Sequence, residues 1–341
     1  MWIKRFLITL FVFCLFGLGA IYFLVKSAEQ QMSLSAQNDA FILQVKKGEN
    51  AFSLYSTLST KLNLETNKHL FKLWSRLNRD KLLIKKGVYQ IDADTNLASV
   101  FQMVSEGKTK QFSVTLVEGH TLKQWYKQLS LTDSLYQDMP AVEVLFSSMS
   151  VHTFCKNEHS SLEGCLLPDT YYYSYEDSAL SILIRAHDAM KSYIEDTWQQ
   201  RFQDVLLNTP YEALILASIV EKETGLASER GLIAGVFANR LQKNMRLQTD
   251  PTVIYGIGDA FDGNITRKHL RTTTPYNTYR IKGLPITPIA MPSRESIMAA
   301  LRPALTEYIY FVSKGDGSHQ FSETLDEHNT AVRRYQLGRK Q

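Results

Sequence analysis

The sequence is poor in cysteine and lacks the motifs of several common enzyme classes. Three cysteines occur in 341 residues, and neither their spacing nor nearby histidines complete a four-ligand zinc site. No G-x-S-x-G, H-E-x-x-H or P-loop motif is present, which excludes the enzyme types that depend on these motifs. Ser105 and Lys108 match S-x-x-K, but Gly107 would break the helix that this motif needs.

The charge and composition are those of an ordinary globular protein. A net charge of +4 is too small to argue for a nucleic-acid partner. No internal repeat is present, so a solenoid is not expected. A chain of 341 residues is long enough for two or three domains.

The first strong feature is an apolar run from Phe6 to Val25, which is long enough to span a bilayer as a helix. Lys4 and Arg5 precede it and favour a cytoplasmic N-terminus. A cleaved signal peptide is the alternative, but the run is too long for one and no clean cleavage site follows. The sequence therefore predicts a single-pass anchor in the inner (cytoplasmic) membrane, with the rest of the chain on the periplasmic side.

The number and spacing of the cysteines are compatible with an oxidising compartment outside the cytoplasm. Cys14 lies within the apolar run, whereas Cys155 and Cys165 lie ten positions apart in a loop-like stretch. An oxidising compartment would allow this pair to form a disulfide. Two buried free thiols are the alternative.

The patterns predict an α+β protein with a small module and a larger domain. The expected divisions are a tail at 1–5, a transmembrane helix at 6–25, a polar linker at 26–40, a module at 41–117 and a domain at 118–341. The module should contain strands at 41–45, 86–91 and 111–117 and helices at 51–62, 68–77 and 97–105. This order resembles a LysM-type glycan-binding module, and a spacer domain is the alternative.

The larger domain is predicted to surround one buried helix, from Tyr211 to Thr224, because its first ten residues are nearly all apolar. Gly225 would end this helix in a left-handed turn. The other expected elements are a mostly helical stretch at 134–204, helices at 229–242, 294–301 and 325–336, loops at 245–258 and 274–285, and a hairpin at 308–324.

Two acids end the buried helix, and the helical repeat places them on different sides. Glu221 should lie over Leu214 and Ala217, and Glu223 about 200° away. They should therefore not form a carboxylate pair. A single carboxyl above an apolar floor would have a raised pKa, the effect for which lysozyme's acid is the standard example. The alternative is that both acids are solvated residues of a last turn.

Several segments, in order, resemble the YceG-like family of endolytic murein transglycosylases. They are Glu163-Gly164, PDT at 168–170, EALILASIVEKET at 212–224, ASER at 227–230, FANR at 237–240, MRLQTDPTVIYG at 245–256, PYNTY at 275–279, GLP at 283–285, YFV at 310–312 and His328-Asn329. The similarity covers about residue 40 to the end. The segment 284–288 and the cysteine pair depart from the family pattern.

The resemblance implies an enzyme that cuts nascent peptidoglycan strands internally, leaves a 1,6-anhydro-N-acetylmuramyl end and so terminates strand elongation. It implies Glu221 as the acid, no metal or cofactor, and peptidoglycan synthases as partners. The substrate-binding residues that it indicates are Gln248, Asp250, Tyr276, Asn277 and Tyr279. One acid can suffice, because the sugar's own C6 hydroxyl attacks and no second carboxylate is needed to activate water.

Two other functions remain open at the level of sequence. One is a catalytically idle glycan-binding scaffold of the wall-synthesis machinery. The other is a hydrolase that uses Glu221 together with a distant acid such as Asp250.

Overall fold

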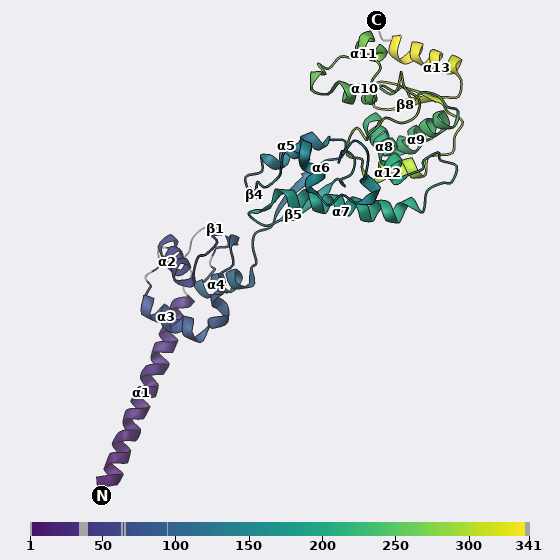
Figure 1. The fold of residues 1–341 in the computed structure, drawn as a ribbon. Coiled ribbons are helices and arrows are strands. Elements are labelled where there is room, and N and C mark those ends of the chain that lie inside the picture. The colour runs from purple at the N-terminus through teal and green to yellow at the C-terminus, as the bar shows by residue number, and fades with distance from the viewer. Residues whose placement is uncertain (1, 34–39, 63, 65, 94, 338–341) are drawn as a thin grey trace. The chain divides into compact units, whose positions relative to one another are not determined.

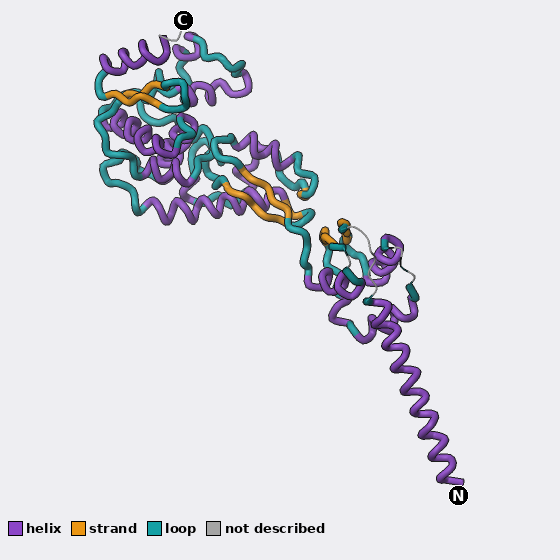
Figure 2. The backbone as a smooth tube through the Cα atoms, turned by 180° about the vertical axis from the view of Figure 1, so that it is seen from behind, coloured by secondary structure: helices purple, strands orange, loops and turns teal. Residues whose placement is uncertain are grey.

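The computed structural model describes residues 2–33, 40–62, 64, 66–93 and 95–337, which form two compact units (Figures 1 and 2). The first contains the chain up to Phe112 together with 172–177, and the second contains 113–171 and the chain from Ser178 onward. Both units combine helices with small two-stranded sheets, which confirms the predicted mixture of α and β structure.

The first unit contains the predicted helices and the first two predicted strands in the predicted order, but the third predicted strand, at 111–117, lies almost entirely in the second unit, because it pairs with residues 169–173. The elements of the first unit are α1 (Trp2–Met32), β1 (Phe41–Val45), α2 (Ala51–Lys61), α3 (Lys68–Leu77), a 3-10 turn (Arg79–Leu82), β2 (Gly87–Ile91) and α4 (Leu97–Glu106). β1 and β2 are antiparallel, with Leu43 opposite Tyr89. The glycan-binding role suggested by this order remains a prediction.

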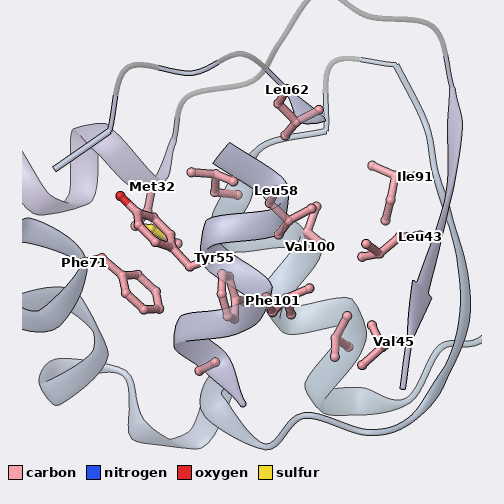
Figure 3. Close-up of a cluster of buried hydrophobic side chains, with 14 of the residues drawn as sticks. Met32, Leu43, Val45, Tyr55, Leu58, Leu62, Phe71, Ile91, Val100 and Phe101 are labelled. Atoms are coloured by element: carbon pink, nitrogen blue, oxygen red, sulfur yellow. The ribbon is translucent and has the colours of Figure 1, made fainter. Parts of the chain in front are cut away.

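The core of the first unit forms because each element buries one face. β1 buries Leu43 and Val45, which alternate with exposed residues along the strand. Tyr55 of α2 stacks on Phe71 of α3 with ring centroids 4.0 Å apart. Met32, at the end of α1, points into the same cluster (Figure 3).

Helix α1 differs from the prediction at its C-terminal end. The expected linker at 26–40 is wrong for residues 26–32, because these continue the helix and bury Ala28, Gln31 and Met32 against the first unit. Residues 34–39 of that linker lie outside the described part of the chain. Among the described helices, residues 8–32 form the one that is long and apolar enough to cross a membrane.

The segment 172–177 belongs to the first unit through side-chain contacts. Gln44 Nε2 donates a hydrogen bond to the Tyr175 hydroxyl at 3.0 Å, and the rings of Phe112 and Tyr173 stack at 5.8 Å. Tyr173 and Tyr175 therefore pack against residues of the first unit.

The second unit is built around helices. Its helices are α5 (Leu122–Ser130), α6 (Leu145–Ser148), α7 (Ala179–Trp198), α8 (Pro210–Glu223), α9 (Ala227–Gln242), α10 (Asp250–Ile257), α11 (Arg267–Arg271), α12 (Arg294–Leu301) and α13 (Leu325–Val332). The strands that lie in it wholly or in part are β3 (Phe112–Leu116), β4 (Leu135–Tyr136), β5 (Asp169–Tyr173), β6 (Asp177–Ser178), β7 (Tyr310–Ser313) and β8 (His319–Ser322). β3 pairs with β5, β4 with β6 and β7 with β8.

Three local predictions in the second unit are wrong. The stretch 134–204 was expected to be mostly helical, but most of residues 134–178 form loops, turns and short strands, and the one long helix of this stretch is α7. The stretch 245–258 was expected to be a loop, but Asp250–Ile257 is α10, with Pro251 in its first turn where no amide donor is needed. Gly225 does not adopt the left-handed conformation. Helix α8 ends because Thr224 is extended, with φ −146° and ψ 136°.

The predicted disulfide between Cys155 and Cys165 is confirmed, with a Cα–Cα distance of 5.9 Å. Both cysteines are fully buried. The bond closes a loop that contains Glu163 and Gly164, two residues of the family-like motifs. Gly164 has φ +73°, and an added Cβ would lie 2.4 Å from Pro288, so only glycine fits there.

Candidate active site

Helix α8 carries the two candidate acids at its C-terminal end. Thr209 caps the helix by accepting a hydrogen bond from the amide of Glu212, and Pro210 occupies the first turn. Residues 213–220 are all buried, because α9, α10 and α12 pack around the helix. The side chains of the two acids that follow this apolar stretch therefore project from a firmly packed helix, in directions set by the helical repeat.

Glu221 faces the start of α12. Its Oε2 atom accepts hydrogen bonds from the Ser293 amide at 2.9 Å and from the Ser293 hydroxyl at 2.5 Å. One turn earlier on α8, Ser218 Oγ accepts a bond from the amide of Ile289 at 3.0 Å. Glu221 thus holds the loop before α12, and a carboxylate at a helix N-terminus is favourably placed.

Glu223 faces a different place, a cavity of about 500 Å³ in the second unit. The polar residues that line it include Glu223, Arg240, Gln248, Asp250, Tyr279, His319 and His328. Glu221 is not among the lining residues. The predicted separation of the two acids is therefore present, but the predicted binding residues that line this cavity lie beside Glu223.

The surroundings of Glu223 favour the protonated form of its carboxyl more than water does. Burial raises its pKa above the ordinary value, and the charge of Asp250 adds to this effect. A hydrogen bond from the Thr249 hydroxyl and the positive charges of His319 and Arg240 oppose it. The net direction is upward, as a general acid requires.

Three of the five predicted binding residues line this cavity. The Tyr279 hydroxyl donates to Asp250 Oδ1 at 2.7 Å, joining the loop at 274–285 to the start of α10. Gln248 has φ +53°, a conformation that non-glycine residues rarely adopt. Its amide donates to the Thr278 carbonyl at 3.2 Å, which fixes it against the same loop.

The other two predicted binding residues lie elsewhere. Asn277 is buried, and its Nδ2 donates to the carbonyls of His269, Leu270 and Thr272, so it stabilises the loop from within. Tyr276 shares a hydrogen bond of 2.8 Å with Thr287, and its ring packs edge-on against Tyr255. Neither residue lines the cavity of Glu223.

Three cavity residues were not assigned a role from the sequence. Arg240 is buried, and it donates to the carbonyls of Ile309 at 2.6 Å and Leu247 at 2.7 Å. His319 is held by Glu229 at 2.7 Å. His328 stacks on Tyr310, and its buried Nδ1 atom has no partner among the described residues. Arg240 lies in the segment FANR and His328 in His328-Asn329, which was the available signal for these two, whereas His319 lies in none of the family-like segments.

A further buried carboxyl, Glu163, lies in a separate cavity of about 730 Å³. Its Oε1 accepts from the Leu122 amide at 2.9 Å and its Oε2 from the Tyr255 hydroxyl at 3.1 Å. Burial raises its pKa to about 7. It links α5 to α10, the helix whose first residue, Asp250, lines the cavity of Glu223.

In the described ranges, no group of three or more His, Cys, Asp or Glu residues is placed to hold a metal ion.

Comparison with known proteins identifies the family. Residues 43–334, which are most of the chain, match the model of the YceG-like family. The chain belongs to this family. The match includes both units and all the acids described above.

Curated relatives of this YceG-like chain carry a functional name. A protein of Bacillus subtilis (strain 168), named endolytic murein transglycosylase, is 32% identical over 263 residues, which cover 73% of this chain and 72% of that protein. A protein of the same name from Streptococcus pneumoniae (strain D39) is 22% identical over 97% of this chain. The chain spans 65% of that relative's length.

A solved structure supports the same assignment. The crystal structure of a YceG-like protein from Listeria monocytogenes is 29% identical, with a TM-score of 0.53. The similarity covers 86% of this chain and 99% of that one.

Proposed function

We propose that this YceG-like chain is an endolytic peptidoglycan lytic transglycosylase and that Glu223 is its general acid. The observation that carries the residue assignment is the cavity: Glu223 lines it together with Gln248, Asp250 and Tyr279, and burial raises its pKa. The names of the curated relatives support the reaction. The substrate is a glycan strand of alternating N-acetylglucosamine and N-acetylmuramic acid.

The reaction needs one group that first donates a proton and then accepts one. Protonated Glu223 donates its proton to the bridging oxygen as the bond between muramyl C1 and this oxygen breaks. The muramyl C6 hydroxyl then attacks C1, and its proton passes to the Glu223 carboxylate. No water is consumed, the product end is a 1,6-anhydro sugar, and Glu223 returns to its protonated state.

The neighbours of Glu223 have separate tasks in this proposal. The Arg240 guanidinium, buried nearby, stabilises the carboxylate that exists between the two proton transfers. The Thr249 hydroxyl donates to Glu223 and fixes its rotamer. Gln248, Asp250 and Tyr279 offer amide, carboxylate and phenol groups for sugar hydroxyls.

Glu221 was the acid indicated by the sequence, and its hydrogen bonds support a different role for it in this proposal. Ser293, at the start of α12, donates two hydrogen bonds to one carboxylate oxygen of Glu221 and thereby holds this side chain in place. We assign Glu221 to positioning the loop before α12. Matched glutamine variants of the two acids decide between these roles.

We further propose that α1 is retained as a single membrane anchor and that both units lie on the periplasmic side. The apolar residues of α1 are exposed along most of its length, for example Phe13 and Phe16, as a lipid-facing helix requires. Strand termination beside a peptidoglycan synthase would follow from this location.

Product mass tests the proposed reaction. Purified glycan strands digested by the full chain should yield new ends that weigh one water less than reducing ends. Reducing ends would instead indicate a hydrolase, in which Asp250 could activate water. A properly folded protein that releases no product would indicate the glycan-binding scaffold.

A further inference from the structure

The first unit carries a concentrated positive charge that the overall composition conceals. Between residues 68 and 86 the sequence contains seven basic residues, Lys68, Lys72, Arg76, Arg79, Lys81, Lys85 and Lys86, and one acid, Asp80. This segment is more positive than the whole chain, whose net charge is +4. Ion pairs among the described residues do not involve any member of the segment.

Helix α3 displays part of this charge as one stripe. Lys68, Lys72 and Arg76 are spaced four residues apart, which places them along one side of the helix, and all three are exposed. The opposite side buries Phe71 and Trp74 in the core. Leu77, at the helix end, is 58% exposed beside these cations.

The start of α3 is tied to the membrane-spanning candidate by buried hydrogen bonds. Gln31 of α1 accepts from the Asn67 amide at 2.6 Å and donates to the Asn67 carbonyl at 3.1 Å. Asn67 is the residue that caps α3. Gln31 also donates to the Tyr55 hydroxyl at 2.7 Å. Because α1 is a continuous helix to Met32, its apolar part and α3 form one rigid piece.

This connection limits how far α3 can lie from a bilayer that contains α1. The seven helical residues from Lys26 to Met32 rise about 10 Å beyond the apolar run, at about 1.5 Å per residue. That distance is similar to the Debye length of about 8 Å at physiological ionic strength. In both views α3 lies at the edge of the unit where α1 leaves it (Figures 1 and 2).

We propose that the basic surface formed by Lys68, Lys72, Arg76, Leu77 and Arg79 binds anionic phospholipid headgroups in the leaflet from which α1 emerges. The cations complement phosphate charge, and Leu77 reaches the apolar boundary below the headgroups. The contact holds the first unit against the membrane surface. It rests on the proposed anchoring of α1, but not on the transglycosylase activity.

The test places a fluorophore on this surface in the full chain, reconstituted in nanodiscs. Leu77→Cys is labelled in a Cys14→Ser background, since Cys155 and Cys165 are paired. A headgroup-spin-labelled lipid serves as the quencher, in discs of phosphatidylcholine with or without phosphatidylglycerol. A label at Gln90→Cys, an exposed position of β2 outside the basic surface, is the control.

Strong quenching at position 77 is expected only in the anionic discs. It should disappear between about 0.1 M and about 1 M salt, since the Debye length falls from about 10 Å to about 3 Å. The double variant Lys72→Gln/Arg76→Gln should lose at least half of the quenching. Lys46→Gln/Lys47→Gln, which removes the same charge from another exposed turn of the unit, should lose none.

Several results would overturn the proposal. Quenching that is equal in neutral and anionic discs, or that both double variants reduce equally, would show that charge on this surface does not bind lipid. If Lys72→Gln/Arg76→Gln leaves the quenching unchanged but abolishes binding to soluble glycan strands, the basic surface binds the peptidoglycan of the cell wall and not lipid. If a fluorophore attached to native Cys14 has the emission of an aqueous environment instead of a lipid environment, α1 is not inserted in the bilayer. This result would contradict both the anchoring and the contact between the basic surface and the headgroups.

Discussion

At the residue scale, the chemistry depends on the protonation of Glu223. A carboxyl that donates a proton must first hold it, and burial favours this by disfavouring the charged form and raising the pKa of Glu223. The Glu223 carboxylate that forms after the first proton transfer is stabilised by the positive charge of Arg240. One residue can therefore act in both steps.

The pH dependence of activity follows from this shift. The free enzyme is active while Glu223 is protonated, so kcat/KM should fall as pH rises through a pKa that lies above the ordinary 4.5. The measurement is kcat/KM on soluble glycan strands across pH. A fall centred at or below 4.5 would show that Glu223 is not the proton donor.

Glu163 provides a second prediction, for stability. Its pKa is raised from 4.5 to about 7, so the folded state binds more protons than the unfolded state between these values. Stability from this group is therefore lost as pH rises from about 4.5 to 7, by up to about 3 kcal/mol at about 1.4 kcal/mol per pKa unit. Glu163→Gln removes this titration.

The difference in free energy of unfolding between the Glu163→Gln variant and the wild type should change in favour of the variant as pH increases across that window, because only the wild type loses this contribution. Denaturant unfolding at pH 5 and pH 8 measures the change. Glu158→Gln, an exposed acid of the same loop, is the matched control and should change stability by less than about 0.5 kcal/mol. Equal pH dependence in the wild type and in Glu163→Gln would contradict the raised pKa.

At the element scale, the disulfide holds the loop that delivers Glu163. Closing a loop of about ten residues removes unfolded-state entropy, so the Cys155→Ser/Cys165→Ser variant should be destabilised by about 2–3 kcal/mol. Cys14→Ser, which alters an exposed free cysteine, should not be. Denaturant unfolding of both variants in detergent measures this, and equal stability would mean that the bond contributes nothing to the fold.

The sequence predicted elements whose pattern is local. Helix α8 was predicted because its buried positions are apolar on all sides, and the hairpin of β7 and β8 because a glycine-rich turn separates two β-prone segments. Helix α10 was missed, because Pro251 near its start and Gly256 and Gly258 near its end resemble loop signals around only eight helical residues, Asp250–Ile257. The position of Pro251 in the first turn favours a helix rather than opposing it.

The site was predictable in part for a related reason. The helical repeat separates Glu221 from Glu223, but it does not reveal which acid meets a cavity. That depends on what packs beside each one, and here α12 covers the first while the loop before α10 leaves space at the second. The role of Asn277 was hidden for the same reason, since its three carbonyl partners are defined only by the folded loop.

At the scale of the whole molecule, one topology is expected. With α1 retained in the membrane and both units outside, protease added to spheroplasts should remove the chain beyond about residue 33. The described part of α1 that precedes this point is the helix Trp2–Met32. Protection of the second unit in intact spheroplasts would place it on the cytoplasmic side and contradict this topology.

The central claim is that this molecule cuts glycan strands with Glu223 as the acid that cannot be replaced. The most direct measurement is the yield of anhydro ends, by mass spectrometry, from one glycan preparation treated with wild type, Glu223→Gln and Glu221→Gln. Loss of general acid–base catalysis costs roughly 10²–10⁴-fold, and Glu223→Gln should lie at the upper end because one residue serves both steps. Glu221→Gln should retain much more activity, since Ser293 can still bond its side-chain amide oxygen. Near-normal turnover by Glu223→Gln together with loss in Glu221→Gln would contradict the account and restore the acid indicated by the sequence.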